Sequence, residues 1–271
     1  YVRLLSTAKK GNLEFAFVLQ RYGMERFLHR LSISPYSDEF ILKGASLFLV
    51  WKGQNFRATK DADFLSFKSH DEKELAEIIR EICSIPGYEE DGIIFETDSI
   101  EVEPIREEQA YGGTRVTLLA RLYNAKISLQ IDIAYGDVVT PSPENVIYPT
   151  ILNRPAPHLR AYTRYSLVSE KLNVMVELGL ANSRMKDFYD IWLVSNLFEF
   201  DFNLLCASVK DTFERRKTDI PGTIPLALTT DFSGNPDKIT QWDAFVKKSK
   251  PNPSAGSLSD TVRRITDFLL P

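Results

Sequence analysis

The chain has 271 residues, of which 44% are hydrophobic, so it can bury the core of one large domain or of two smaller ones. Its net charge of −4 argues against a surface built throughout for nucleic acid, although basic residues can still gather locally. The longest apolar runs are far shorter than the roughly 20 residues that cross a bilayer, so no membrane span is expected. The first residues mix charged and apolar side chains, unlike a signal peptide, and we expect a cytoplasmic protein whose natural N-terminus precedes Tyr1.

The two cysteines, Cys83 and Cys206, lie far apart in the sequence and outside any CxxC or Cys/His cluster. This spacing argues against a disulfide framework and against a structural zinc site. We therefore expect both residues to be buried free thiols.

The first fifth of the chain predicts helices that lead into a strand, a tight turn and another helix. Apolar residues recur at helical spacing over residues 1–31, with breaks expected at Gly11 and Gly23. The pattern then predicts a short strand over Phe40–Leu42 and a helix over Leu47–Trp51.

Strand patterns dominate the segment that follows. Ala62–Phe67 is β-like, whereas the charged, amphipathic stretch Asp71–Ser84 predicts a helix. Further strands are expected at Gly92–Glu96, Ile100–Ile105, Arg115–Tyr123 and Lys126–Ala134.

Prolines mark the middle of the chain. The stretch Pro141–Pro157 is rich in proline, which disfavours a continuous helix or a central strand, and we interpret it as a linker. We place the boundary between an N-terminal core (1–150) and a helical C-terminal domain (151–271) within it. Helices are expected there at Arg164–Leu180, Ser183–Leu197, Asn203–Arg216, Lys238–Ser249 and Ser257–Leu270, with a loop or lid at Pro221–Pro236.

Two carboxylates open the predicted strand that begins at Asp61. Because side chains alternate along a strand, Asp61 and Asp63 project from one face while Ala62 points to the core. Such a pair repels itself unless a cation lies between the two groups, and Mg²⁺ is commonly held by one or two carboxylates together with substrate phosphates. A pair of solvated carboxylates at a strand end is the plainer alternative.

Residues before this pair could bind phosphate. The turn Lys43-Gly44-Ala45-Ser46 joins a strand to a helix, where free backbone N–H groups meet anions, although it could also be a simple tight turn. Arg57 and Thr59 share a face if the chain is extended, and the guanidinium of Arg57 can fork onto a phosphate.

A third acidic residue comes from the late strand. In the alternating segment Lys126–Ala134, Asp132 is placed among residues that should pack in a core, so it either pairs with a cation or reaches the edge of a cleft. Asp137 is a weaker candidate, because it follows Gly136 in a turn.

The second half carries a charged group of its own. Lys171 falls on an otherwise apolar helical stripe, and Asp187 and Asp190 lie one turn apart on the next predicted helix. This pattern indicates a polar centre between two helices that could direct Lys171 toward a phosphate. A lysine that extends to solvent, or a purely structural salt-bridge network, is the alternative.

Together these segments resemble the AbiEii/AbiGii family of nucleotidyltransferase toxins, within the DNA polymerase β-like superfamily. The resemblance covers most of the chain and rests on RFLHRLSISPYSDEFILKGASLFLVW, RATKDADF, LQIDIAYGD and SEKLNVMVELGLANSRMKDFYDIWLV. Ala45 departs from the pattern, because family members often have a second glycine there. The resemblance implies an α+β fold, in which a polymerase β-like core with a mixed sheet flanked by helices precedes an all-α C-terminal domain.

The resemblance also implies roles for individual residues in a cleft that binds an NTP with Mg²⁺ or Mn²⁺. Gly44 and Ser46 would cradle the triphosphate, and Asp61 and Asp63 would ligate the metal, with Asp132, by its strand position, as the third catalytic carboxylate and a further metal ligand. Lys171 would contact the phosphates, and Asp187 or Asp190 would complete the site.

The expected reaction is transfer of NMP from an NTP to RNA, at the 3′ end of tRNA, with release of pyrophosphate. This expectation follows from the family, whose members are toxins of toxin–antitoxin or phage-defence operons, so an antitoxin encoded nearby is expected as a partner. Alternatives are nucleotidylation of a protein hydroxyl and a non-catalytic module that binds RNA or antitoxin. A metal-dependent phosphohydrolase would place histidines near the acids, which the sequence does not. Basic residues that could face RNA are Arg154, Arg160, Arg164, Arg184 and Lys186.

Overall fold

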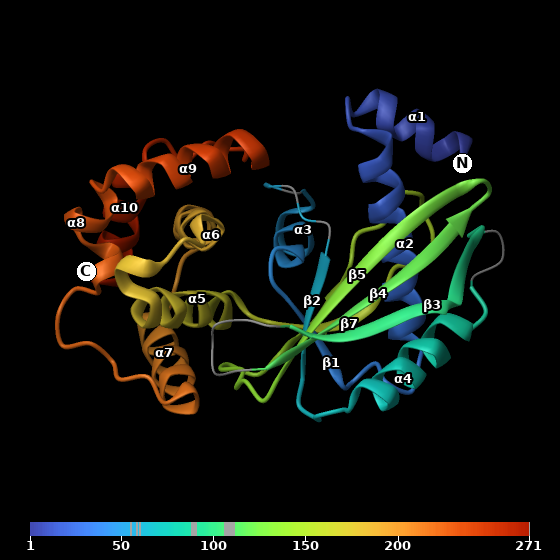
Figure 1. Cartoon of the computed structure of the whole chain (residues 1–271), viewed down its shortest axis with the longest axis horizontal. Helices are drawn as coiled ribbons and strands as arrows, with labels where there is room; N and C mark the ends of the chain where they lie inside the picture. Colours follow the sequence, from blue (N-terminus) through green and yellow to red (C-terminus); the bar gives the residue numbers. More distant parts are fainter. Residues whose placement is uncertain (55, 58, 60, 88–90, 106–111, 271) are drawn as a thin grey trace. The chain divides into compact units, whose positions relative to one another are not determined.

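The computed structural model describes residues 1–54, 56–57, 59, 61–87, 91–105 and 112–270 (Figure 1). The chain forms two compact units. The first comprises Tyr1–Asn55, Thr59–Gly136 and Glu144–Ala161, and the second comprises Phe56–Ala58, Asp137–Pro143 and Tyr162–Pro271. The boundary that we placed at residue 150 therefore falls within a stretch of the first unit.

The helices of the first unit agree with the sequence pattern except at Gly23. They are α1 (Val2–Lys10), α2 (Phe15–Ser32), α3 (Ser46–Lys52) and α4 (Glu72–Ser84). Gly11 ends α1 as expected, but α2 continues through Gly23. A Cβ atom at residue 23 would lie 3.2 Å from Ile127 and 3.3 Å from Leu129. The glycine lets α2 approach the sheet closely, so its role is in packing and the predicted break is wrong.

A mixed sheet forms the centre of the first unit. Its strands are β1 (Phe40–Lys43), β2 (Asp61–Ser66), β3 (Ile93–Ile105), β4 (Gly113–Leu122), β5 (Ala125–Tyr135), β6 (Glu144–Ile147) and β7 (His158–Ala161). Their order is β3-β4-β5-β2-β1-β7-β6, in which β2 is parallel to β5 and β1 is parallel to β7. The helix-flanked mixed sheet confirms the expected α+β core.

Two strand predictions differ from the structure. The two strands expected before residue 106 are one strand, β3, whose pairing with β4 shifts register between Glu96 and Glu101. The proline-rich stretch holds β6, which pairs with β7, so it is more than a linker. Because β6 is an edge strand and its prolines lie outside it, no hydrogen bond of the ladder is lost.

An apolar cluster lies between helices α2 and α4 and one face of the sheet. Along β5 the isoleucine and leucine residues are buried while the residues between them are not, as the alternation predicts. Phe27 of α2 and Ile79 of α4 line one apolar cluster with Ile131 and Ile133 of β5. Each such side chain contributes about 1.5–3 kcal/mol when it is fully buried. The polar residues of β5, including Asp132, lie on the opposite face.

The second unit is helical, as expected. It contains α5 (Arg164–Leu178), η1 (Gly179–Ala181), α6 (Met185–Leu197), α7 (Phe202–Arg216), η2 (Leu226–Leu228), α8 (Thr230–Ser233), α9 (Pro236–Ser249) and α10 (Leu258–Leu269). Side chains of Thr163, Asp201 and Ser257 accept hydrogen bonds from the first turns of α5, α7 and α10, which fixes where these helices begin. The predicted loop at 221–236 contains the short helices η2 and α8.

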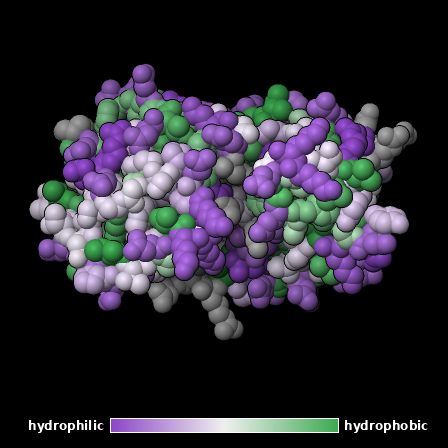
Figure 2. Space-filling model, turned by 90° about the horizontal axis from the view of Figure 1, so that it is seen from above, coloured by the Kyte–Doolittle hydropathy of each residue, from purple (hydrophilic) through white to green (hydrophobic). Residues whose placement is uncertain are grey.

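The face shown in Figure 2 is mixed in polarity, and one of the two cysteines is exposed. In Figure 2, hydrophilic residues are spread over the face shown, with hydrophobic residues in small areas between them. Cys83 is buried, whereas Cys206 is exposed because its position on α7 faces outward, so the prediction of two buried thiols is wrong for Cys206. Within the described ranges, no helix is both long enough and apolar enough to cross a membrane.

Candidate active site

Three carboxylates lie on one face of the sheet in the first unit. Asp63 of β2 is the register partner of Asp132 of β5, and Asp61 is the partner of Gln130. Residues directly opposite each other project from the same face, so all three acids share the face that does not carry the isoleucine core. Ala62, between the two aspartates of β2, is fully buried and fixes this orientation.

The turn after β1 is shaped around one of these carboxylates. Gly44 has a φ of +72°, and a Cβ atom built on it would lie 2.0 Å from Oδ2 of Asp63. A glycine is required here both because its backbone is left-handed and because the carboxylate occupies the space that a side chain needs. Lys43, the last residue of β1, is the register partner of Asp63. The turn and the carboxylate are therefore in contact.

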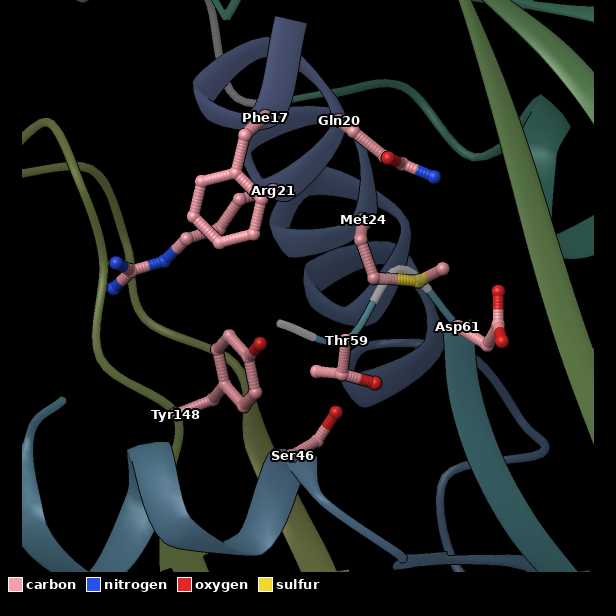
Figure 3. A pocket seen from close by; sticks show the side chains of 8 residues that line it. All are labelled: Phe17, Gln20, Arg21, Met24, Ser46, Thr59, Asp61 and Tyr148. Carbon is pink, nitrogen blue, oxygen red and sulfur yellow. The ribbon is translucent and has the colours of Figure 1, made fainter. Parts of the chain in front are cut away.

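A pocket opens beside Asp61 (Figure 3). Oxygen atoms of Ser46, Thr59 and Asp61 lie at one side of it, and Met24 of α2 lies between them and the N-terminal part of that helix. The residues that line it are Phe17, Gln20, Arg21, Met24, Ser46, Thr59, Asp61 and Tyr148. The structure thus brings together the predicted residues Ser46, Thr59 and Asp61, and adds α2 side chains and Tyr148. Sequence reasoning missed these additions because the pattern of α2 reads only as a helix that packs in a core.

Asp132 has a cation partner of its own. Arg115 of β4, its register partner, donates from Nε to Oδ1 and from Nη2 to Oδ2, each at 2.8 Å. Gln130 Nε2 lies 3.2 Å from both carboxylate oxygens. Among the residues that the structure describes, no three His, Cys, Asp or Glu side chains are grouped so as to hold a metal ion. Asp132 shares the face of Asp61 and Asp63 but is ion-paired with Arg115.

The residues of this face fit a divalent cation that is held by two protein carboxylates. Asp61 and Asp63 supply the hard oxygen ligands that Mg²⁺ prefers, and Mg²⁺ usually completes its coordination with water and substrate phosphates. Gly44 adds no side chain beside Asp63, where a Cβ atom would lie 2.0 Å from Oδ2. The donor set therefore suits Mg²⁺ or Mn²⁺ with a phosphate ligand.

A second charged cluster lies in the helical unit. Arg57 donates from Nε and Nη2 to the two oxygens of Asp190 of α6, each at 2.8 Å, and Nζ of Lys171 of α5 lies 3.0 Å from Asp190. Lys171 also pairs with Asp187, to which Arg184 Nε donates at 2.8 Å. The carboxylates of Asp187 and Asp190 are buried, whereas Arg184 is about a third exposed. The predicted polar centre between two helices is present, with Arg57 as an additional member.

All members of this cluster are charged at neutral pH. Burial opposes the charged form of Lys171, but the carboxylates of Asp187 and Asp190 outweigh it, and the pKa of Lys171 is raised. Burial likewise favours the neutral form of Asp190, but Arg57 and then Lys171 outweigh it and lower its pKa. Among its described ion pairs, three cations meet two carboxylates. The ion pairs hold Lys171 and Arg57 in fixed positions.

Arg57 and Thr59 belong to different units, although an extended chain would place them on one face. Arg57 belongs to the second unit, through its pair with Asp190, whereas Thr59 belongs to the first unit and lines the pocket there. The remaining predicted residues form two groups. Gly44, Ser46, Asp61, Asp63 and Asp132 lie in the first unit, and Lys171, Asp187 and Asp190 lie in the second.

Two solved structures share the fold. The crystal structure of a candidate nucleotidyltransferase from H. pylori aligns with a TM-score of 0.55 at 17% sequence identity, covering 95% of this chain and 94% of that one. The crystal structure of JHP933 from Helicobacter pylori aligns with a TM-score of 0.52 at 16% identity, covering 93% of this chain and 90% of that one. At such low identity the likeness concerns the fold alone.

A family model that matches most of the sequence identifies the family. The model of the nucleotidyl transferase AbiEii toxin family, of type IV toxin–antitoxin systems, matches residues 26–266, and the chain belongs to this family. The protein is therefore a nucleotidyltransferase, as the sequence predicted. Membership implies an NTP as substrate and an antitoxin as partner. A search of curated proteins gave no match.

Proposed function

We propose that this enzyme transfers NMP from an NTP to the 3′-terminal hydroxyl of an RNA, with tRNA as the preferred acceptor, in a reaction that requires Mg²⁺. The observation that carries this proposal is the common face of Asp61, Asp63 and Asp132, next to the turn at Gly44. Carboxylates on adjacent strands of one face are suited to hold a divalent cation, and the turn at Gly44, with backbone N–H groups before a helix, is suited to admit phosphates.

Each residue of the first unit has a defined task in this proposal. Asp61 and Asp63 hold Mg²⁺ or Mn²⁺, and Gly44 and Ser46 admit the β- and γ-phosphates. A bound divalent cation lowers the pKa of an acceptor hydroxyl and offsets the charge on the phosphates. Thr59 lies with Ser46 in the pocket, where its hydroxyl can donate to a phosphate oxygen.

The bond changes follow from this arrangement. The 3′-oxygen of the acceptor attacks the α-phosphorus of the NTP, and the bond between that phosphorus and the bridging oxygen of the β-phosphate breaks. Pyrophosphate leaves with the electron pair, and the proton of the hydroxyl passes to water. Asp132 lies on the side of Asp63 away from the turn at Gly44, so we assign it to the acceptor side.

The cluster of the second unit supplies positive charge. We assign Lys171 and Arg57 to the phosphates of the nucleotide, with Asp187 and Asp190 as the residues that position them. The fixed positions of Lys171 and Arg57 support this role, because charge that develops on the phosphates is stabilised best by cations already held in place.

The test is incubation of the purified protein with total tRNA, Mg²⁺ and each of the four α-labelled NTPs in turn. The matched control is Asp61→Asn/Asp63→Asn, and a second control replaces Mg²⁺ with EDTA. We expect label on RNA from wild type alone and only with the metal. Label on the protein would instead indicate a protein hydroxyl as acceptor, and no label with any NTP would contradict catalysis by this site.

A further inference from the structure

A row of charged residues crosses five strands of the sheet. Successive register partners are Lys43 of β1, Asp63 of β2, Asp132 of β5, Arg115 of β4 and Glu103 of β3. Register partners share a face, so this row passes from the turn at the end of β1, through two of the three carboxylates, to the guanidinium of Arg115 and then to Glu103. Asp63 therefore has Lys43 as its neighbour on one side of the carboxylate pair, whereas Asp132 has Arg115 on the other side.

Arg115 has binding capacity that its partner Asp132 does not use. A guanidinium has five N–H donors, of which two are engaged with Asp132. No other described residue accepts a hydrogen bond from it, and its side chain is 35% exposed. Held in place by Asp132, Arg115 presents its remaining N–H donors to solvent between Asp132 and Glu103, the carboxylate opposite it on β3.

The direction of the reaction places the acceptor at this end of the row. In an in-line displacement the attacking oxygen and the leaving group lie on opposite sides of the phosphorus. If the leaving phosphates lie at the turn beside Lys43 and Gly44, the acceptor approaches from the side of Asp132 and β4. Arg115, the ion-pair partner of Asp132, lies on that side.

The acceptor's own charge makes such a cation necessary. An RNA 3′ end brings a phosphodiester close to its terminal hydroxyl, and this face already carries Asp61, Asp63 and Asp132. Like charges at short range repel unless a counter-charge is present. Guanidinium binds phosphate in a bidentate manner, and Arg115 is already oriented by its bond to Asp132.

We propose that Arg115 binds the last phosphodiester of a nucleic-acid acceptor, and that its pair with Asp132 fixes it for that contact. The proposal rests on the proposed function and specifies the acceptor as a polynucleotide. A protein hydroxyl carries no such phosphate and gains nothing from this cation.

The first experiment measures binding of a short RNA with a free 3′-hydroxyl, without NTP, by fluorescence anisotropy. Arg115→Gln should raise the Kd about tenfold or more, and Arg115→Lys should raise it less, because a lysine keeps the charge but loses the fork. Arg115→Gln should also lower the slope of log Kd against log salt by about 0.7. The matched control is Arg121→Gln, which removes an arginine paired with Glu96 on the same face of the same strand. It should leave the Kd unchanged.

A second experiment identifies the phosphate. Replacing the last phosphodiester of the RNA by an uncharged methylphosphonate should weaken binding to the wild type as much as Arg115→Gln does, and should have no further effect on Arg115→Gln. Equal losses in wild type and variant would overturn the contact. So would an unchanged Kd in Arg115→Gln, or failure of the wild type to bind RNA. If these binding results hold but no nucleotide is transferred to RNA, the proposed reaction fails and the contact stands.

Discussion

The carboxylate of Asp63 occupies the space in which residue 44 would carry a side chain: a Cβ atom on Gly44 would lie 2.0 Å from Oδ2 of Asp63. The two residues sit on adjacent strands, Gly44 directly after the end of β1 and Asp63 in β2. We assign the turn to the phosphates and the carboxylate to the metal. Because the two are in contact, a change in one of them also alters the other.

Gly44→Ala should abolish transfer, because the new methyl group displaces the Asp63 carboxylate. The left-handed backbone adds a folding cost of about 1–2 kcal/mol. Gly53→Ala is the matched control: Gly53 has a φ of +69°, and nothing lies within 4 Å of its Cβ position. It should show a similar loss of stability with normal activity. Denaturant unfolding and initial rates of both variants separate the two effects, and full activity in Gly44→Ala would contradict the assignment.

Arg57→Ala should destabilise the helical unit by less than the about 3–5 kcal/mol of a fully unpaired buried charge, because the buried Asp190 loses its bidentate partner but keeps Lys171. Arg57→Lys should cost less, since it keeps the charge. Arg263→Ala provides the comparison within the same unit, because its pair with Asp260 is exposed and should be worth less than about 1 kcal/mol. The measurement is the free energy of unfolding in urea. Equal, small losses in all three variants would show that the cluster contributes nothing to stability.

The same cluster should make the protein sensitive to acid. The pKa of Asp190 is below its ordinary 3.8 in the folded chain, since Arg57 and Lys171 outweigh its burial. A lowered folded pKa gives stability that is present above the ordinary pKa and is lost as the pH falls through the folded value. The slope is at most about 1.4 kcal/mol per pH unit for each proton taken up. Unfolding curves from pH 6 to pH 3 should show this loss, and the slope should be smaller in Asp190→Asn.

The two thiols should react very differently. Burial raises the pKa of Cys83 to about 12, so its thiol is protonated at pH 8 as well as shielded. Cys206 is exposed. A thiol reagent should therefore modify one cysteine in the native protein and both after denaturation, and Cys206→Ser should abolish the native reaction. Rapid native modification of that variant would show that Cys83 is accessible.

The sequence predicted what periodicity and local chemistry control. Asp61 and Asp63 alternate with the buried Ala62, so their common face follows from the spacing alone. The ion-pair partner of Asp132 could also be predicted from the sequence. A two-residue turn at Tyr123 and Asn124 fixes the β4–β5 register, and counting back from it places Arg115 opposite Asp132.

Contacts between distant segments could not be read in this way. The parallel pairing that sets Asp63 beside Asp132 has no local turn to define its register. Arg57 meets Asp190 across more than a hundred residues, which no spacing rule anticipates. The short strand β6 escaped detection because four residues next to prolines carry little periodic signal.

The most direct test of the central claim is to follow both ends of the triphosphate in one reaction. The protein is incubated with tRNA and Mg²⁺, once with NTP labelled at the α-phosphate and once at the γ-phosphate. The account predicts that α-label enters RNA, that γ-label leaves as pyrophosphate in equal amount, and that Asp63→Asn does neither. Transfer of γ-label to any acceptor, release of inorganic phosphate alone, or undiminished transfer by Asp63→Asn would contradict it.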